Sequence, residues 1–246
     1  MAAINTGLVL RVLQPIWRET PETASRVRMR MERVLGWAAV HGYRSGDNAA
    51  RWRGHLDHLL PAQGAISPVR HLRALPYSEV PAFIADLRQR NGAAPAFEFL
   101  ILTATPTSEV LGATWSEFDL DAKTWTISAE RTKSGREHRV PLCPRAIEIL
   151  ETIPRKGGRP FPYVSNVFLQ MLQRMNRRGI TGHGFRSSFR DWAAEQHEAS
   201  REVAEMALAH AISDKTEAAY RRGDMFEKRR RLMADWAAFC TGAAHA

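Results

Sequence analysis

Two residues that could bind a phosphate stand three positions apart in a short glycine-bracketed stretch. His183 and Arg186 occur within Thr181-Gly182-His183-Gly184-Phe185-Arg186. A turn that leads into a helix would put both side chains on one face, and a helix N-terminus flanked by cations favours an anion. The apolar residues at i, i+4, i+7 and i+8 predict the buried stripe that would hold this helix: Phe185, Phe189, Trp192 and Ala193. Most His/Arg pairs on helices are surface residues, so the motif alone does not define a site.

Three more residues with suitable chemistry accompany this pair. Lys133 stands between two stretches that alternate with period two, 124–128 and 137–142, which predicts a β-hairpin with Lys133 at its turn. An ordinary charged hairpin tip is the simpler interpretation of Lys133 alone. His210 ends an apolar helix predicted over 203–209, and Tyr220 lies early on the next predicted helix.

This set is suited to cutting a DNA strand without water. A tyrosine hydroxyl can form a phosphodiester that conserves the bond energy, so the strand can be rejoined without ATP. Arg186 would bind the non-bridging oxygens, and the two histidines would donate to them or manage the tyrosine proton. Lys133 suits a general acid for the leaving 5′-hydroxyl. The chemistry needs no metal and no cofactor.

Composition and charge favour a polyanionic partner. The chain has 246 residues, of which 44% are hydrophobic, and 35 Lys and Arg exceed 26 Asp and Glu to give a formal charge of +9. No apolar run approaches the ~18 residues of a membrane-spanning helix. The N-terminus lacks the features of a signal peptide. Two cysteines without metal-ligand spacing are typical of a reduced compartment, so we expect a cytoplasmic protein.

The chain is expected to form two domains. A helical domain over 1–64 includes a helix beginning at Pro21 and a short helix over 48–60, with Trp52, Leu56 and Leu59 inward. A linker follows over 65–74, since 61–68 is rich in Pro and Gly. The second domain, 75–246, is expected to be mainly α with a small antiparallel β-sheet.

The sequence resembles tyrosine recombinases of the phage-integrase family, and among them the P4-type integrases of prophages and genomic islands. The resemblance covers nearly the whole chain and is carried by the stretches 131–133, 137–142, 183–186, 209–210 and 218–220. It implies that Tyr220 is the nucleophile and that Arg186, His183, His210 and Lys133 complete the catalytic set. It also implies a core-binding domain over 1–64 that grips DNA opposite the catalytic domain. The cations expected to contact DNA are Arg26, Arg28, Arg30, Arg33, Arg136 and Arg190.

The resemblance also implies partners. These are double-stranded DNA attachment sites and four protomers on two duplexes during reaction, with a monomer otherwise. Host bending or directionality factors would assist, and the protein would associate with the bacterial nucleoid.

Two departures from the family pattern matter. The first is that the chain begins at the core-binding domain, without the preceding domain that binds arm-type sites, as expected of a truncated form, a fragment or an arm-less variant. The second is that the first catalytic arginine belongs at position 106, where this chain has Pro106, with no Arg or Lys anywhere from 91 to 122. Proline suits a helix's first turn, with Thr105 as the expected cap, so the fold should tolerate the change. Loss of one preorganised charge donor costs roughly 10²–10³ in rate.

Two functional hypotheses therefore stand. One is a site-specific recombinase that acts through Tyr220, impaired by Pro106. The other is a catalytically inactive DNA-binding remnant of an integrase. A basic RNA-binding protein is a weaker alternative, because it leaves the ordered Lys/His/Arg/His/Tyr set unexplained.

Overall fold

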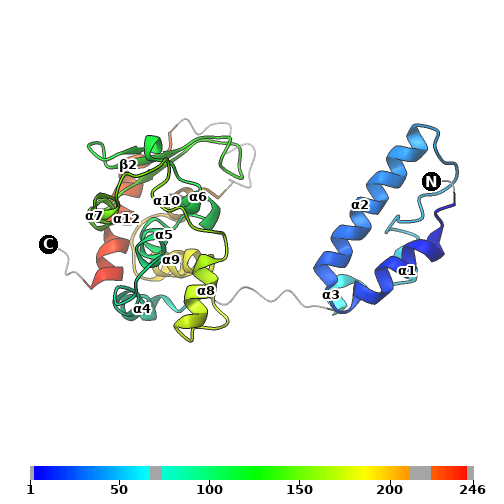
Figure 1. The fold of residues 1–246 in the computed structure, drawn as a ribbon, viewed down its shortest axis with the longest axis horizontal. Helices are drawn as coiled ribbons and strands as arrows, with labels where there is room; N and C mark the ends of the chain where they lie inside the picture. Colours follow the sequence, from blue (N-terminus) through cyan, green and yellow to red (C-terminus); the bar gives the residue numbers. More distant parts are fainter. Residues whose placement is uncertain (1–2, 67–73, 211–222, 243–246) are drawn as a thin grey trace. The chain divides into compact units, whose positions relative to one another are not determined.

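The computed structural model describes residues 3–66, 74–210 and 223–242 of the chain. Two compact units, Met1–His71 and Leu72–Ala246, divide the chain, and Figure 1 traces the elements of each. The described residues are mainly helical and include one three-stranded antiparallel sheet, which confirms the predicted fold class. The predicted domain limits of 1–64, 65–74 and 75–246 stay a prediction.

The helices and strands follow one another along the chain in this order. The N-terminal unit contains α1 (Thr6–Trp17), α2 (Pro21–Val40), the 3₁₀ turn η1 (Leu56–His58) and α3 (Gln63–Ile66). The C-terminal unit contains η2 (Tyr77–Glu79), α4 (Val80–Leu87), α5 (Ala94–Thr103), α6 (Thr107–Leu111), η3 (Trp115–Glu117), β1 (Phe118–Asp119), β2 (Thr124–Ile127), β3 (His138–Pro141), α7 (Pro144–Thr152), α8 (Val167–Arg174), α9 (Gly184–Glu195), α10 (Arg201–Ala207) and α12 (Phe226–Thr241).

The N-terminal unit is built on the contact between α1 and α2. Its core includes Val9, Leu13, Trp17 and Leu35. The Trp17 indole donates to the carbonyl of Pro61 at 3.0 Å, which ties the end of this unit back onto α1. Helix α2 begins at Pro21 as predicted, with proline where its missing N–H costs nothing.

The helix predicted over 48–60 was wrong. This segment forms turns with the single short turn η1, and Leu59 is 52% exposed instead of facing inward. The side chain of Asn48 accepts from Ala50 N, and that of Asp57 accepts from Gly54 N and His55 N. Short polar side chains that bond to nearby backbone amides compete with the helix, and here they prevail.

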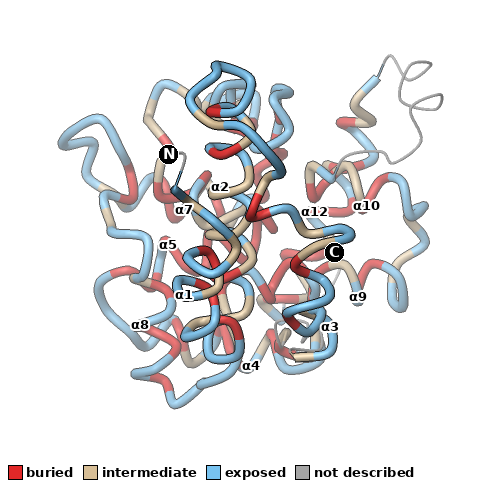
Figure 2. Tube along the Cα trace, turned by 90° about the vertical axis from the view of Figure 1, so that its right-hand side faces the viewer, coloured by how far each residue is buried: buried red, intermediate tan, exposed pale blue. Residues whose placement is uncertain are grey.

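The C-terminal unit is organised around α5, in which every residue except Pro95 is buried (Figure 2). Its side chains are mostly apolar, which favours a place inside the core, and its one carboxylate, Glu98, is neutralised by ion pairs with Arg88 and Arg145. Helices α4, α6, α7 and α12 pack against α5, and the rings of Phe168 on α8 and Phe185 on α9 lie against Phe97. The Trp236 indole on α12 donates to the carbonyl of Ile101 on α5 at 2.8 Å, which fixes the two helices against each other.

The sheet has the order β1-β2-β3, with both pairs antiparallel. Trp125 on β2 is paired with Phe118 on β1 and with Val140 on β3, and its side chain is fully buried. The two strands predicted from period-two alternation are β2 and β3, and the turn that joins them carries Lys133. Among the described residues, no helix combines the length and the apolar character required to cross a membrane.

Candidate active site

Arg186 is buried at the start of α9. The stripe predicted from the sequence holds this helix, because Phe185, Phe189, Trp192 and Ala193 are all buried. The Arg186 guanidinium donates from Nη1 to the carbonyl of Ala104 at 2.5 Å and from Nη2 to the carbonyl of Leu208 at 2.6 Å. Those carbonyls lie at the C-terminal ends of α5 and α10, so Arg186 joins three segments that are distant in sequence.

A carboxylate lies close to this guanidinium. Glu109 on α6 is 5% exposed, and its Oε2 has no hydrogen-bond partner within the described part of the chain; the same is true of Arg186 Nε. Burial raises the pKa of Glu109 above its ordinary value, although the cations Arg186 and Arg131 oppose that rise. Burial lowers the pKa of Arg186, and Glu109 opposes that change. Arginine remains charged in either case.

The structure brings His183, Arg186, His210 and Lys133 together. His183 immediately precedes α9, where Thr181 accepts the amide of Gly184. Partial burial lowers the pKa of His183, and the nearby positive charges of Arg186, His210 and Lys133 lower it further. Its imidazole is therefore favoured in the neutral form, in which one ring nitrogen can accept a proton.

Glu205 fixes His210 and Arg190. His210 follows α10, and its Nδ1 is 2.6 Å from Glu205 Oε2. The other carboxylate oxygen accepts from Arg190 Nε, also at 2.6 Å. Burial acts to raise the pKa of Glu205, but the hydrogen bonds from His210 and Arg190 outweigh it and lower the pKa overall. The carboxylate therefore orients the His210 ring and directs Nε2 away from Glu205.

The β2–β3 hairpin presents Lys133 at an ordered turn. The hydroxyl of Thr132, which is 8% exposed, donates to the carbonyl of Arg136 at 2.7 Å and accepts its amide at 3.1 Å. Arg131 forms an ion pair with Glu117 and donates to the carbonyl of Glu109 at 2.7 Å. Lys133 itself is exposed. The hairpin is thus tied to α6 on one side and leaves its cation accessible.

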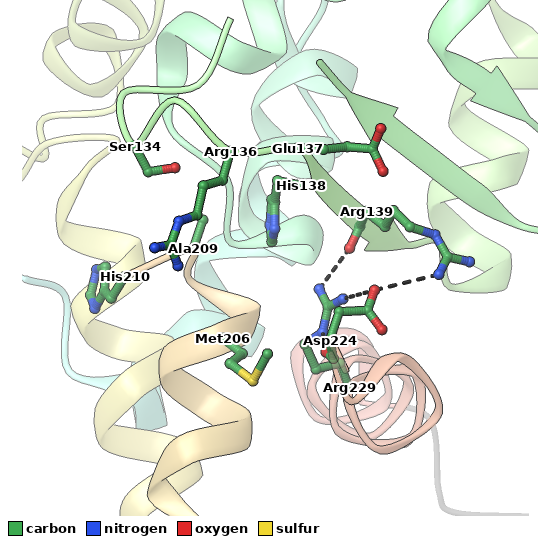
Figure 3. A pocket seen from close by; sticks show the side chains of 10 residues that line it. All are labelled: Ser134, Arg136, Glu137, His138, Arg139, Met206, Ala209, His210, Asp224 and Arg229. Carbon is green, nitrogen blue, oxygen red and sulfur yellow. Dashed lines mark hydrogen bonds and ion pairs between the residues drawn. The ribbon is translucent and has the colours of Figure 1, made fainter. Parts of the chain in front are cut away.

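A cavity of about 350 Å³ lies between this hairpin and the end of α10 (Figure 3). It is lined by Ser134, Arg136, Glu137, His138, Arg139, Met206, Ala209, His210, Asp224 and Arg229. Arg136 and His210 lie on the same side of it, and on the opposite side Arg229 bonds to Asp224 and to the carbonyl of Arg139. Burial, together with the cations Arg229 and Arg186, lowers the pKa of His138 to about 4.

Position 106 lacks the expected cation. Pro106 lies before α6 as its cap, with an extended ψ of 147°, and not at the first helical position as predicted. Thr105 does not cap the helix either, because its hydroxyl is bonded to that of Thr103 at 2.8 Å inside the core. The prediction that the fold accommodates proline here is consistent with this geometry, since the carbonyl of Pro106 accepts the amide of Glu109 at 3.0 Å.

The predicted DNA-binding arginines differ in their surroundings. Arg28 is directed into the N-terminal unit, where it pairs with Glu32 and donates to the carbonyl of Ala50 at 3.0 Å. Arg26 pairs with Glu22 on the surface. Arg30 and Arg33 are exposed and make no hydrogen bond or ion pair within the described ranges. Arg190 is held by Glu205, whereas Arg136 is exposed at the hairpin turn.

Tyr220 lies outside the described residues. Among the residues that are described, no group of three or more His, Cys, Asp or Glu side chains could hold a metal ion.

Sequence reasoning missed Glu109, His138 and Glu205. A glutamate five residues before His210 on a predicted helix gave no sign that it would reach both His210 and Arg190. His138 appeared only as a member of an alternating strand, and its burial next to Arg229 depends on the docking of α12.

Comparison with known proteins assigns the chain to a class. The model for the phage integrase family matches residues 74–226, and that for the phage integrase central domain matches residues 1–55. The chain belongs to the phage integrase family.

Individual relatives agree with this assignment. The chain is 31% identical over 243 residues to prophage integrase IntZ of Escherichia coli K12, covering 93% of this chain and 58% of that protein. It is 27% identical over 244 residues to the integrase of Enterobacteria phage P4, covering 87% of this chain and 54% of that protein. The chain thus spans little more than half the length of these relatives.

Solved structures share the fold. A lambda integrase(75-356) dimer bound to a COC′ core site has a TM-score of 0.63 at 17% identity, covering 86% of this chain and 81% of that one. A lambda integrase tetramer bound to a Holliday junction has a TM-score of 0.64 at 15% identity, covering 87% and 66%. The resemblance inferred from the motifs is therefore confirmed at the level of the family.

Proposed function

We propose that the chain is a site-specific DNA recombinase that cuts and rejoins DNA through a 3′-phosphotyrosyl intermediate at Tyr220. The observation that carries the proposal is the convergence of Arg186, His183, His210 and Lys133, on three separate segments, at one end of α9. An anion is the ligand that such a concentration of donors favours.

Each residue has a role in the cleavage step. The Tyr220 oxygen attacks the phosphorus and forms the P–O bond, the P–O5′ bond breaks, and Lys133 gives its proton to the leaving O5′. His183, kept neutral by its surroundings, accepts the phenolic proton. Arg186 and His210 donate to the non-bridging oxygens, where negative charge increases in the transition state. Rejoining reverses these transfers.

We propose further that Pro106 weakens this reaction. Removal of one preorganised donor typically lowers the rate roughly 10²–10³-fold. The test uses a nicked duplex that carries a core site selected by the protein from a randomised pool, with covalent adduct measured on a denaturing gel. The wild-type chain should form adduct slowly, Pro106→Arg should form it faster, and Tyr220→Phe should form none. Adduct formation by the Tyr220→Phe protein would refute the role of Tyr220.

Pro106 also favours a second candidate, an inactive DNA-binding remnant. In that case the selected duplex would still be bound, but neither the wild-type chain nor Pro106→Arg would become linked to it. Equal adduct formation by the wild-type chain and Pro106→Arg would instead contradict the proposed impairment.

The partner we propose is double-stranded DNA, with four protomers assembling on paired sites. Arg30 and Arg33 on α2, exposed and unpaired within the described residues, are the phosphate contacts in the N-terminal unit. Each phosphate contact adds roughly 0.9 to the slope of log affinity against log salt. Arg30→Gln with Arg33→Gln should therefore flatten that slope, while Arg28→Gln, whose partner lies within its own unit, should not.

A further inference from the structure

A second hollow, of about 590 Å³, lies beside the start of α9 in the C-terminal unit. Its lining comes from α6, from the turn before α9 and from the segment between α7 and α8: Pro106, Thr107, Ser108, Leu111, Gly112, Arg159, Tyr163, Ser165 and His183. The start of α6 and the turn before α9 are in close contact, because a Cβ added at Gly182 would meet Thr107 Oγ1 at 3.4 Å. Position 106 and His183 thus belong to one site.

Among the described residues that line the hollow there is one arginine, Arg159, which is 53 residues away from Pro106 in the sequence. Arg159 is exposed and makes no hydrogen bond or ion pair with the described residues. None of the described lining residues is an Asp or a Glu. Its charge is therefore available to an anion that enters the hollow.

The backbone on both sides of Arg159 is anchored. The carbonyl of Gly158 accepts the amide of Trp115 at 3.1 Å. On the other side Pro160 is buried, and Phe161 is 1% exposed with its ring 5.2 Å from that of Phe99. A side chain that stands between two such anchors leaves from a defined point, which reduces the entropy lost when its guanidinium binds a ligand.

The guanidinium is also the appropriate donor for this position. The forked N–H groups of arginine match two oxygens of a phosphate, which lysine cannot do. Arg186 uses Nη1 and Nη2 on backbone carbonyls, so it has only its remaining N–H groups for a phosphate. A second arginine would add charged donors to those that Arg186 and His210 offer the non-bridging oxygens.

We propose that Arg159 partly replaces the cation that the family has at position 106, and that it binds a non-bridging oxygen of the scissile phosphate across the hollow from His183. The replacement is partial because Arg159 is exposed and stands on a loop, so Pro106 still lowers the rate. This proposal rests on the proposed recombinase function for the identity of the phosphate. The anion site itself does not depend on that function.

Inorganic phosphate is the probe for the site. It is titrated into the full chain at low salt, and the imidazole NMR signals of His183, assigned by their loss in His183→Gln, report binding. Arg159→Ala should weaken phosphate affinity roughly tenfold, as expected for one lost charge-assisted hydrogen bond. Introducing Pro106→Arg into Arg159→Ala should restore the affinity to near the wild-type value.

Arg155→Ala is the matched control. Arg155 lies on the same segment but stacks on Trp115, with its Cζ 5.2 Å from the ring centroid, and it does not line the hollow. Its loss should leave phosphate binding unchanged. If Arg159→Ala weakens binding no more than Arg155→Ala, the proposal is overturned. If Pro106→Arg fails to restore phosphate binding in the Arg159→Ala background, the claim that Arg159 acts in place of an arginine at position 106 is likewise overturned.

Phosphate binding needs neither Tyr220 nor strand cleavage, so this test and the adduct test fail separately. If the chain forms no adduct but its phosphate affinity still depends on Arg159, the proposed recombinase function is refuted and the proposed anion site stands. An adduct that forms equally in the wild-type chain and in Arg159→Ala would refute the role of Arg159 and leave the recombinase.

Discussion

Replacing His138 by Gln should remove much of the acid sensitivity of the C-terminal unit. His138 is 8% exposed on β3, where burial and the cations Arg229 and Arg186 lower its pKa from 6.5 to about 4. The folded protein therefore holds this proton less tightly than the unfolded chain. The free energy of unfolding should fall as the pH drops below 6.5, and the contribution of His138 should level off near pH 4. A pKa that falls from 6.5 to about 4 on folding corresponds to a loss of about 3 kcal/mol in the free energy of unfolding when His138 becomes protonated.

The assay is urea unfolding of the full chain at neutral pH and near pH 4. Unfolding of the C-terminal unit is monitored by hydrogen exchange in peptides from α5. This helix lies in the core of the C-terminal unit, so its exchange reports that unit and not the other. The wild-type protein should lose about 3 kcal/mol more than His138→Gln between the two pH values. His58→Gln, an exposed histidine of the N-terminal unit, is the control and should behave as wild type. Equal pH dependence in the wild-type chain and His138→Gln would refute the reasoning.

Three further predictions concern polar groups that are buried or half-buried. Glu109→Gln should raise the melting temperature at neutral pH but not at acid pH, because burial raises the pKa of Glu109 and the charged form destabilises the fold as the pH rises; an equal effect at both pH values would contradict this. Trp236→Phe should lower the free energy of unfolding in urea by about 1–3 kcal/mol, since the carbonyl of Ile101 loses its buried donor. An unchanged free energy of unfolding would mean that this hydrogen bond does not stabilise the fold. Arg131→Met should speed hydrogen exchange in the hairpin over 128–138 by breaking the ion pair with Glu117, while unchanged exchange would mean that Thr132 alone orders the turn.

The sequence predicted the elements whose residues repeat with a clear period. The apolar stripe from Phe185 to Ala193 and the alternation around Trp125 each reflect burial on one face, which is a local property. The segment 97–103 is apolar except for Glu98 and Thr103, and it forms most of α5 in the core.

Elements decided by single polar side chains could not be predicted in this way. The Asn48 and Asp57 side chains bond to the backbone and replace a helix that the apolar spacing favoured. Thr105 was expected as a cap, yet its hydroxyl is turned toward Thr103 in the core.

The site was predictable in its residue types but not in its supports. His183 and Arg186 could be recognised from their spacing, whereas the carboxylate that holds His210 belongs to Glu205 only because the chain turns sharply after α10, where Ala209 has a φ of 52°. The proximity of Arg159 to Pro106 depends on how the segment after α7 packs on Trp115 and Phe99.

The two carbonyl contacts of Arg186 have a consequence for how variants at this position are interpreted. Because its guanidinium links the ends of α5 and α10, replacing it leaves two backbone acceptors without a donor and loosens both helix ends. A lysine has a single ammonium group and cannot span both acceptors, so even Arg186→Lys alters the conformational entropy of the unit as well as its charge. Lost activity in such a variant therefore measures order and chemistry together, and only a comparison of stability with phosphate affinity can separate them.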